Sequence, residues 1–446
     1  MFRRREEFLS LLYLLRRFVS IGAIICVLLA IGLYVGTPSH SVSIQRGTLP
    51  YVFRHEHGHA KRPTSASNAP DVDTIPRKYM EALLSQNYQV MWSLLHPNMQ
   101  IKWKDETEFA SFWQHRFQDY TLESYTLGKI QHRAFWVDPE TIVQYKQVDE
   151  IPISLQLTLT NAARHHSILP PEAMHPGELL RNLPFIVQHI AAQNGNAARW
   201  FVLAGGPADI EAPLLPPITP VTRRVQVPIL IYHHINPFTS SDPLSNYIPT
   251  WVVSPMNFSQ QMDYLTIRGY HTITLNQLFN ALYYDGPLPN RPIILTFDDG
   301  SIDHYQYAYP ILLKHHFSGM FYIITGIVGW NEQMNWPQMR EMLAHGMQMG
   351  SHTVHHVDLA AALNRSEDMV QEELQQSKSL LQKQLGIVIQ QFCYPYGDPF
   401  NRGSDEQRQR IVTLLTADGY VGATTAFGET GSTQESQHPF ALLRIM

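Results

Sequence analysis

The feature that most constrains the fold is a series of short apolar runs in the second half of the chain. Each run is followed directly by residues that can bind a cation or move a proton. The four runs with their polar ends are Val227–Tyr232 before His233-His234, Pro292–Phe297 before Asp298-Asp299-Gly300, Met347–Gly350 before Ser351–His356, and Gln391–Tyr394 before Pro395-Tyr396-Gly397. In a parallel α/β barrel, the chemistry lies where the carboxyl ends of the strands meet. The pattern therefore predicts a barrel with a reactive rim.

Helical patterns alternate with these runs through residues 227–446. Repeated strand-then-helix spacing predicts an α/β domain whose parallel sheet closes, or nearly closes, into a distorted (β/α) barrel. The expected strands, besides the first run, are His271–Thr274, Ile293–Phe297, Gly319–Thr325, Met347–Gly350, Gln391–Tyr394, Tyr420–Thr424 and Phe440–Ile445. The expected helices are Asn257–Arg268, Leu275–Tyr284, Tyr305–His316, Trp336–His345, Glu367–Leu385 and Ser404–Ala417.

The N-terminus predicts a membrane anchor. Residues 18–36 form 19 uncharged, mostly apolar positions, which is long enough to cross a bilayer, and five arginines precede them. The positive-inside rule then keeps the N-terminus in the cytoplasm and sends the rest of the chain outside. A cleaved signal peptide is the alternative, but it would end in a small-residue site, whereas Tyr34–Pro38 follows here. We expect residues 1–36 to be a cytoplasmic tail and a transmembrane signal anchor of a single-pass cell-membrane protein.

Two further units are expected between the anchor and the barrel. Residues 37–74 are polar and aperiodic and predict a flexible tether. Residues 75–205 begin with apolar residues at helical spacing, from Met80 to Leu95, and continue into strand-like stretches, which predicts an α+β domain. This order resembles the cone-shaped nuclear-transport-factor-like domains. Residues 206–226 contain five prolines and predict a semi-rigid linker to the barrel at 227–446.

Charge and cysteine content exclude some classes of protein. The formal net charge is −5 and no basic stripe is present, so nucleic acid is not an expected partner. The two cysteines are Cys26, within the expected anchor, and Cys393, within an expected barrel strand. We therefore expect no disulfide, and the external domains must be held together by their apolar cores.

The rim residues suit a water-activating metal ion. Such an ion favours three protein ligands from imidazole and carboxylate groups and leaves one position open. His352 and His356 are four residues apart, so one helical turn would place both on the same side. Either Asp298 or Asp299 can complete the set, because adjacent carboxylates point in different directions. One of them can bind the ion while the other accepts a proton.

Three short motifs resemble those of a known family. Thr296–Gly300 reads T-F-D-D-G, His352–His356 reads H-T-V-H-H, and Phe392–Gly397 reads F-C-Y-P-Y-G. The first two resemble motifs of the polysaccharide deacetylase (NodB-homology) family. The third resembles the variant motif of its poly-N-acetylglucosamine deacetylase branch. The resemblance covers about residues 225–446 and does not extend to the middle domain.

The resemblance implies a role for each rim residue. It makes Asp298 the general base and gives the metal ligands as Asp299, His352 and His356. It also implies that the backbone N–H of Tyr396 helps to hold the oxyanion. The metal is a divalent ion, for which zinc is favoured by the ligand set, although cobalt or nickel can fill such a site.

The general acid departs from the commoner family pattern. Most relatives end in an L-x-I-x-x-H motif, but Phe440–Met446 has no histidine. Leu230–His233 resembles that motif moved to the front, as in the permuted exopolysaccharide deacetylase branch. This assigns the acid to His233, with His234 as the alternative. Cys393 stands where many relatives carry an arginine that orients the base, and Arg444 is a candidate to supply that charge.

The expected function is removal of N-acetyl groups from an extracellular or cell-wall polysaccharide that contains N-acetylglucosamine. The expected partners are the N-acetylated glycan and, through the N-terminal helix, the membrane. Two alternatives stay open. In one, the barrel is an inactive glycan-binding or sensor module. In the other, the same chemistry acts on a lipid-linked or small N-acyl sugar.

Overall fold

The computed structural model describes residues 72–160, 163, 179–191, 198–205, 214, 216–217, 220–237, 251–426 and 431–446. The expected anchor at 18–36 and nearly all of the expected tether lie outside these residues. No helix within the described ranges has the length and apolar character needed to cross a membrane. The membrane anchor therefore stays a prediction from the sequence.

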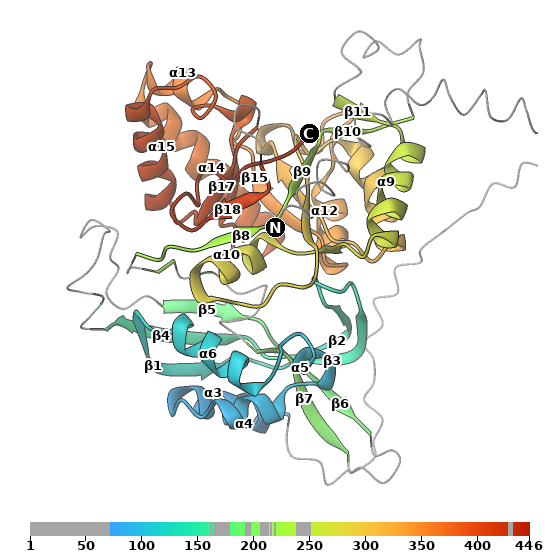
Figure 1. The fold of residues 1–446 in the computed structure, drawn as a ribbon, viewed down its shortest axis with the longest axis vertical. Helices are drawn as coiled ribbons and strands as arrows, with labels where there is room; N and C mark the ends of the chain where they lie inside the picture. The colour runs from blue at the N-terminus through green and yellow to red at the C-terminus, as the bar shows by residue number, and fades with distance from the viewer. Residues whose placement is uncertain are drawn as a thin grey trace, which may run out of the picture. The chain divides into compact units, whose positions relative to one another are not determined.

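The middle domain begins with helices and continues as two antiparallel sheets (Figure 1). The sheets have the strand orders β1-β4-β5 and β2-β3-β6-β7. The helices are α3 (Thr74–Leu84), α4 (Tyr88–Leu94), α5 (Pro97–Gln100) and α6 (Glu106–Arg116). The strands are β1 (Tyr120–Leu127), β2 (Gln131–Val137), β3 (Gln144–Glu150), β4 (Ile153–Leu159), β5 (Leu179–Leu183), β6 (Phe185–Ile190) and β7 (Arg199–Gly205). Helices followed by antiparallel strands give the α+β arrangement expected from the sequence.

The first helical region of this domain differs from the prediction. The apolar spacing from Met80 to Leu95 predicted one helix, whereas the structure has α3 and α4. Gln86 adopts a left-handed φ of 56° between them, and the Asn87 side chain accepts a hydrogen bond from the Val90 N–H at 3.1 Å. Asn87 therefore caps a new helix. The spacing alone did not reveal the break, because Met80 and Met91 are both fully buried.

The second domain is built on a curled parallel sheet (Figure 1). Its main order is β12-β13-β14-β15-β16-β17, and β9 also pairs with β13. The strands are β9 (Ile229–Tyr232), β12 (His271–Thr272), β13 (Pro292–Phe297), β14 (Met320–Ile323), β15 (Gln348–Ser351), β16 (Gln391–Cys393) and β17 (Gly422–Thr424). All these pairs are parallel, so the carboxyl ends of the strands share one rim. This confirms the predicted α/β class.

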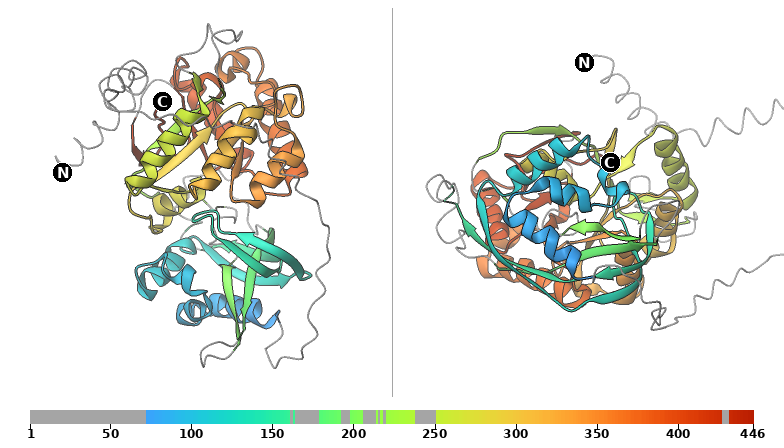
Figure 2. Two further views of the ribbon diagram at one scale, coloured as in Figure 1. Left: turned by 90° about the vertical axis from the view of Figure 1, so that its right-hand side faces the viewer. Right: turned by 90° about the horizontal axis from the view of Figure 1, so that it is seen from below.

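Helices follow the strands and surround the sheet (Figure 2). They are α9 (Pro255–Ile267), α10 (Leu275–Tyr284), α11 (Tyr309–Lys314), α12 (Trp336–Ala344), α13 (Leu359–Leu363), α14 (Glu367–Leu385) and α15 (Asp405–Ala417). Capping boxes at Thr274, Asn335 and Ser404 fix where α10, α12 and α15 begin. The helix expected at Tyr305–His316 begins instead as a π-helical turn, His304–Ala308, before α11. Helix α13 was not predicted.

The last segment of the chain was expected to be a strand over Phe440–Ile445, and this is wrong. It forms only isolated parallel bridges, Leu442 with Thr424 and Ile445 with Leu230. Between these bridges, the N–H and C=O of Leu443 bond the Gln434 side chain at 3.0 Å, which interrupts a continuous ladder. The segment nevertheless links β17 to β9, the strands at which the curled sheet would otherwise remain open.

The remaining short pairs flank the barrel. Strand β8 (Arg224–Gln226) pairs with β18 (Thr433–Glu435) in antiparallel orientation, and β10 (His234–Ile235) pairs with β11 (Val252–Val253) in parallel orientation.

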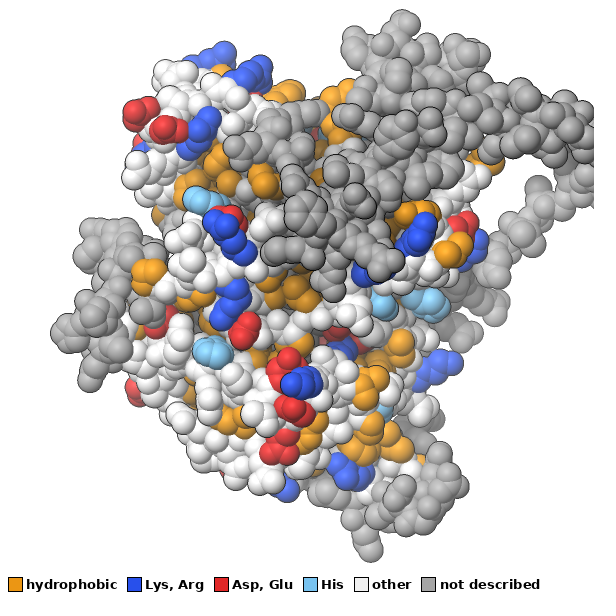
Figure 3. All heavy atoms as spheres, viewed as in Figure 1, with side chains coloured by type: hydrophobic (Ala, Val, Ile, Leu, Met, Phe, Trp, Pro, Cys, Tyr) orange, Lys and Arg blue, Asp and Glu red, His pale blue; other side chains and the backbone are white. Residues whose placement is uncertain are grey.

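On the face shown in Figure 3, basic and acidic side chains are interspersed among polar and apolar ones. The described residues on this face therefore form no large field of a single sign.

Candidate active site

Each predicted site residue lies just beyond the carboxyl end of a rim strand. His233 follows β9, Asp298 and Asp299 follow β13, His352 follows β15, and Tyr396 follows β16 by a short turn. The turn after β13 is sharp, because Asp299 and Gly300 both have φ of +76°. A left-handed residue at this point separates the directions of the two neighbouring carboxylates.

Three predicted metal ligands converge. The Asp299 Oδ1 atom lies 3.4 Å from the Nε2 atom of His352 and 3.4 Å from that of His356. One ligand atom from each residue lies within 4.8 Å of the others. Asp299 Oδ1 is buried and has no hydrogen-bond partner within the described part of the chain. A buried acceptor left without a donor is costly, and a cation shared with the two imidazoles would satisfy it.

A hydrogen bond orients His352, and burial favours the neutral form of His356. His352 Nδ1 donates to the Cys393 carbonyl at 2.8 Å, which leaves Nε2 as the coordinating atom. Burial, followed by the neighbouring His352, lowers the pKa of His356 to about 4. His356 is therefore neutral at physiological pH, as metal binding requires.

The expected helical turn between the two histidines is absent. Thr353 and His356 have φ of +65° and +56°, so residues 352–356 form an irregular loop. The loop is held by a bond from the His356 N–H to Thr353 Oγ1 at 2.9 Å, and the two imidazole rings still lie 4.8 Å apart. Convergence on one face therefore comes from a tight turn rather than from helical periodicity.

The third histidine of this motif, His355, points away from the predicted metal ligands. His355 Nδ1 contacts Glu373 Oε1 at 2.7 Å, and its side chain is mostly exposed. The other Glu373 oxygen accepts the N–H groups of Val354 and His355 at 2.8 and 2.9 Å. Glu373, which the sequence gave no reason to single out, therefore anchors the loop from α14.

The predicted base is held by a buried ion pair. Arg444 Nη1 and Nη2 donate to the two oxygens of Asp298, each at 2.8 Å, and both residues are almost fully buried. Burial alone would raise the pKa of Asp298, but the guanidinium outweighs it and keeps the pKa below its ordinary value. Arg444, the candidate suggested for the missing family arginine, is thus in contact with the predicted base.

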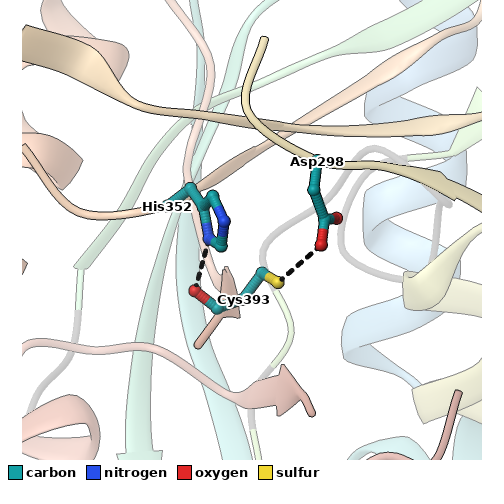
Figure 4. A group of neighbouring side chains, drawn as sticks. All are labelled: Asp298, His352 and Cys393. Carbon is teal, nitrogen blue, oxygen red and sulfur yellow. Dashed lines mark hydrogen bonds between the residues drawn. The ribbon is translucent and has the colours of Figure 1, made fainter. Parts of the chain in front are cut away.

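A second group of possible ligands fits a metal less well. Asp298, His352 and Cys393 also offer atoms within 4.8 Å of one another. Figure 4 shows them side by side, with a His352 nitrogen directed at the Cys393 carbonyl and the Cys393 sulfur 3.6 Å from Asp298. However, the Asp298 oxygens are already bonded to Arg444, whose cation would repel a metal ion. The group around Asp299 has no such competitor.

The two candidate acids lie in different surroundings. His233 Nε2 is 4.0 Å from Asp298 Oδ2. The His233 ring packs edge-on against Trp251, with 4.3 Å between the ring centroids. Burial lowers the pKa of His233. His234 instead donates from Nδ1 to Asp303 at 2.9 Å, and this bond raises the pKa of His234. Of the two, His233 is therefore the one that faces Asp298, the predicted base.

Tyr396 lies at the mouth of the site. Its φ of +60° and ψ of 2° are left-handed, and its ring is 4.6 Å from that of His356. The role of its N–H in holding an oxyanion stays a prediction.

The sequence did not predict that Trp251 and Asp303 belong to the site. Neither residue is part of a motif, and only the folded chain brings them next to His233 and His234.

Comparison with known proteins agrees with these motifs. The family described as Polysaccharide deacetylase matches residues 285–413. The putative polysaccharide deacetylase YxkH of Bacillus subtilis (strain 168) is 30% identical over 226 residues, which cover 50% of this chain and 72% of that protein. The chain belongs to the polysaccharide deacetylase family, as its motifs predicted.

The chain is also similar to two other deacetylases. The poly-beta-1,6-N-acetyl-D-glucosamine N-deacetylase of Staphylococcus aureus (strain MSSA476) is 28% identical over 188 residues, covering 39% of this chain and 62% of that protein. Among solved structures, the Streptococcus pyogenes deacetylase PplD in complex with acetate is 31% identical with a TM-score of 0.44. That match covers 50% of this chain and 92% of the PplD chain.

Proposed function

We propose that this protein is a metal-dependent hydrolase that removes N-acetyl groups from an extracellular or cell-wall polysaccharide containing N-acetylglucosamine. The observation that carries the proposal is the buried Asp299 Oδ1 atom, which lies 3.4 Å from Nε2 of both His352 and His356. The next carboxylate in the sequence, Asp298, is bound to an arginine instead. Family membership supports the reaction class. The name of the staphylococcal relative supports an N-acetylglucosamine polymer as substrate.

The residues divide the work of amide hydrolysis. Asp299, His352 and His356 would hold a divalent cation, which when bound polarises water and the acetamide carbonyl. Asp298 accepts the proton of the attacking water, and Arg444 keeps that carboxylate ionised and oriented. His233 donates a proton to the departing amine, for which its place beside Asp298 is suitable. The N–H of Tyr396 is proposed to stabilise the oxyanion.

Zinc is the proposed metal, because two imidazoles and one carboxylate leave a fourth position open for water. Cobalt and nickel accept the same ligands and are the alternatives. The proposed location is the outer face of the cell membrane. It rests on the apolar segment at 18–36 and on the arginines before it.

The test is acetate release by the purified full-length chain in detergent. Acetylated β-1,4 and β-1,6 glucosamine oligomers should both be offered to the metal-stripped protein, before and after zinc, cobalt or nickel is added. We expect release only with metal. Asp298→Asn should lower kcat by about 10²–10⁴-fold while still binding the ion.

Other outcomes would support the alternatives. Metal binding without acetate release from any glycan would favour the inactive binding module. Release from a monosaccharide or lipid-linked sugar, but not from oligomers, would favour the small-substrate deacylase. Equal acetate release with and without metal would overturn the proposed mechanism.

A further inference from the structure

Two exposed aromatic side chains stand out beside the candidate site. Among the large hydrophobic residues in the described part of the chain, Trp330 and Tyr396 are the exposed aromatic ones, at 66% and 50%. They lie on the rim loops that follow β14 and β16. These strands are the two neighbours of β15, which carries the His352–His356 loop. The two rings are thus borne by loops on either side of the histidine ligands.

The loop that bears Trp330 is bonded to both segments that supply metal ligands. On one side, the Met334 N–H donates to the Gly300 carbonyl at 3.0 Å, and the Ile302 N–H donates to the Glu332 carbonyl at 2.9 Å. On the other side, the Gly326 N–H donates to the Val354 carbonyl at 2.8 Å. The loop therefore spans from the segment after Asp299 to the segment between the two histidines.

The tip of this loop is itself folded. The N–H of Trp330 donates to the Ile327 carbonyl at 3.0 Å, and the Gln333 N–H donates to the Trp330 carbonyl at 3.1 Å. Gly329 takes φ +80° while its N–H bonds the Met334 carbonyl, and Met334 anchors the loop in the core. Trp330 is thus held on an ordered backbone, yet its indole gains little from burial.

We propose that Trp330 forms a sugar-stacking subsite, which binds a ring of the glycan next to the one that is deacetylated. This inference rests on the proposed function. A pyranose ring has one apolar face of C–H groups that fits against an indole, while its hydroxyls need hydrogen-bond acceptors at the edge. Asn331 and Glu332 follow Trp330 and are both exposed, so they can supply such acceptors. A rigid aromatic residue loses little entropy on binding.

The subsite predicts that the enzyme distinguishes oligomers from single sugars. A monosaccharide in the catalytic site cannot also cover Trp330, whereas a longer chain can. The wild-type kcat/KM should therefore rise with chain length. Trp330→Ala should reduce the gain in kcat/KM from the single sugar to the longest oligomer by about tenfold, mainly by raising the KM for the oligomer. We expect this because aromatic anchors often carry much of the binding energy. Trp330→Phe should retain part of this gain.

The experiment measures acetate release by the metal-loaded full-length chain from N-acetylglucosamine oligomers of one to five rings. Ile267→Ala is the matched control, since Ile267 is 82% exposed but lies at the end of α9, before β12 begins. The control should keep the wild-type dependence on chain length. Metal content, measured for each variant, ensures that the catalytic site is equally loaded.

Each outcome decides between explanations. Loss of the chain-length dependence in Trp330→Ala alone supports the subsite. An unchanged dependence on chain length in that variant overturns it. No acetate release by the wild type from any oligomer overturns the proposed function and this inference with it.

Discussion

The positive charge that pairs with Asp298 is that of Arg444, which lies in the last segment of the domain. The motif position that carries an orienting arginine in many relatives is Cys393 here, and its sulfur lies 3.2 Å from Arg444 Nη2. The small thiol leaves space for the Arg444 guanidinium to reach Asp298 from the final segment. The sequence showed the missing arginine and a candidate replacement. It could not show the contact, because residues 146 positions apart meet only when the sheet curls.

Replacing this arginine tests its role. Arg444→Met should lower kcat and destabilise the fold by about 3–5 kcal/mol, because a buried carboxylate would lose its partner. Denaturant unfolding and acetate release measure the two effects. Arg410→Met is the control, since Arg410 pairs with Glu367 at the surface and should change neither. An Arg444→Met protein with unchanged stability and kcat would contradict the account.

The pH dependence should separate the two candidate acids. Only protonated histidine can donate to the amine, so kcat/KM should fall as the pH rises through the pKa of the acid. Burial lowers the pKa of His233, whereas Asp303 raises that of His234. We expect this fall to begin below the ordinary histidine value. His233→Asn should remove the alkaline limb, and His234→Asn should keep it. The reverse result would assign the acid to His234.

At the scale of elements, local signals predicted most of the second domain. Helices α10 and α14 have the predicted bounds, because a capping box starts α10 and a left-handed Gly386 ends α14. The loop at 352–356 was assigned wrongly, since the spacing of two histidines fits a helical turn as well as a tight loop. The final segment was also wrong, because the side chain of Gln434 takes hydrogen bonds that a strand would have used.

The strand that carries His352 depends on a close approach at Gly350. A Cβ atom there would lie 2.6 Å from Tyr322 Cδ1 and 3.2 Å from the Gln391 carbonyl, on the two neighbouring strands. Gly350→Ala should therefore lower the free energy of unfolding by about 1–3 kcal/mol and weaken metal binding. Ser379→Ala, at an exposed position of α14, is the control. An equal free energy of unfolding for the two variants would contradict this prediction, because it would show that the neighbouring strands can move apart without loss of stability.

At the scale of the whole molecule, the sequence predicted the curled parallel sheet and the residues at its rim. It predicted less well how the chain closes that sheet, because closure depends on the short bridges made by Leu442 and Ile445. The resemblance of the middle domain and the anchor at 18–36 stay predictions. The site itself depends on three loops meeting at one rim, which follows from the parallel strand order.

The central claim is that Asp299, His352 and His356 share one cation. A crystal structure of the zinc-loaded chain, with anomalous diffraction recorded at the zinc edge, tests this most directly. We predict one strong anomalous peak, about 2.0–2.2 Å from an Asp299 oxygen and from Nε2 of each histidine. A peak held by Cys393 and Asp298, or none at the rim, would contradict the account.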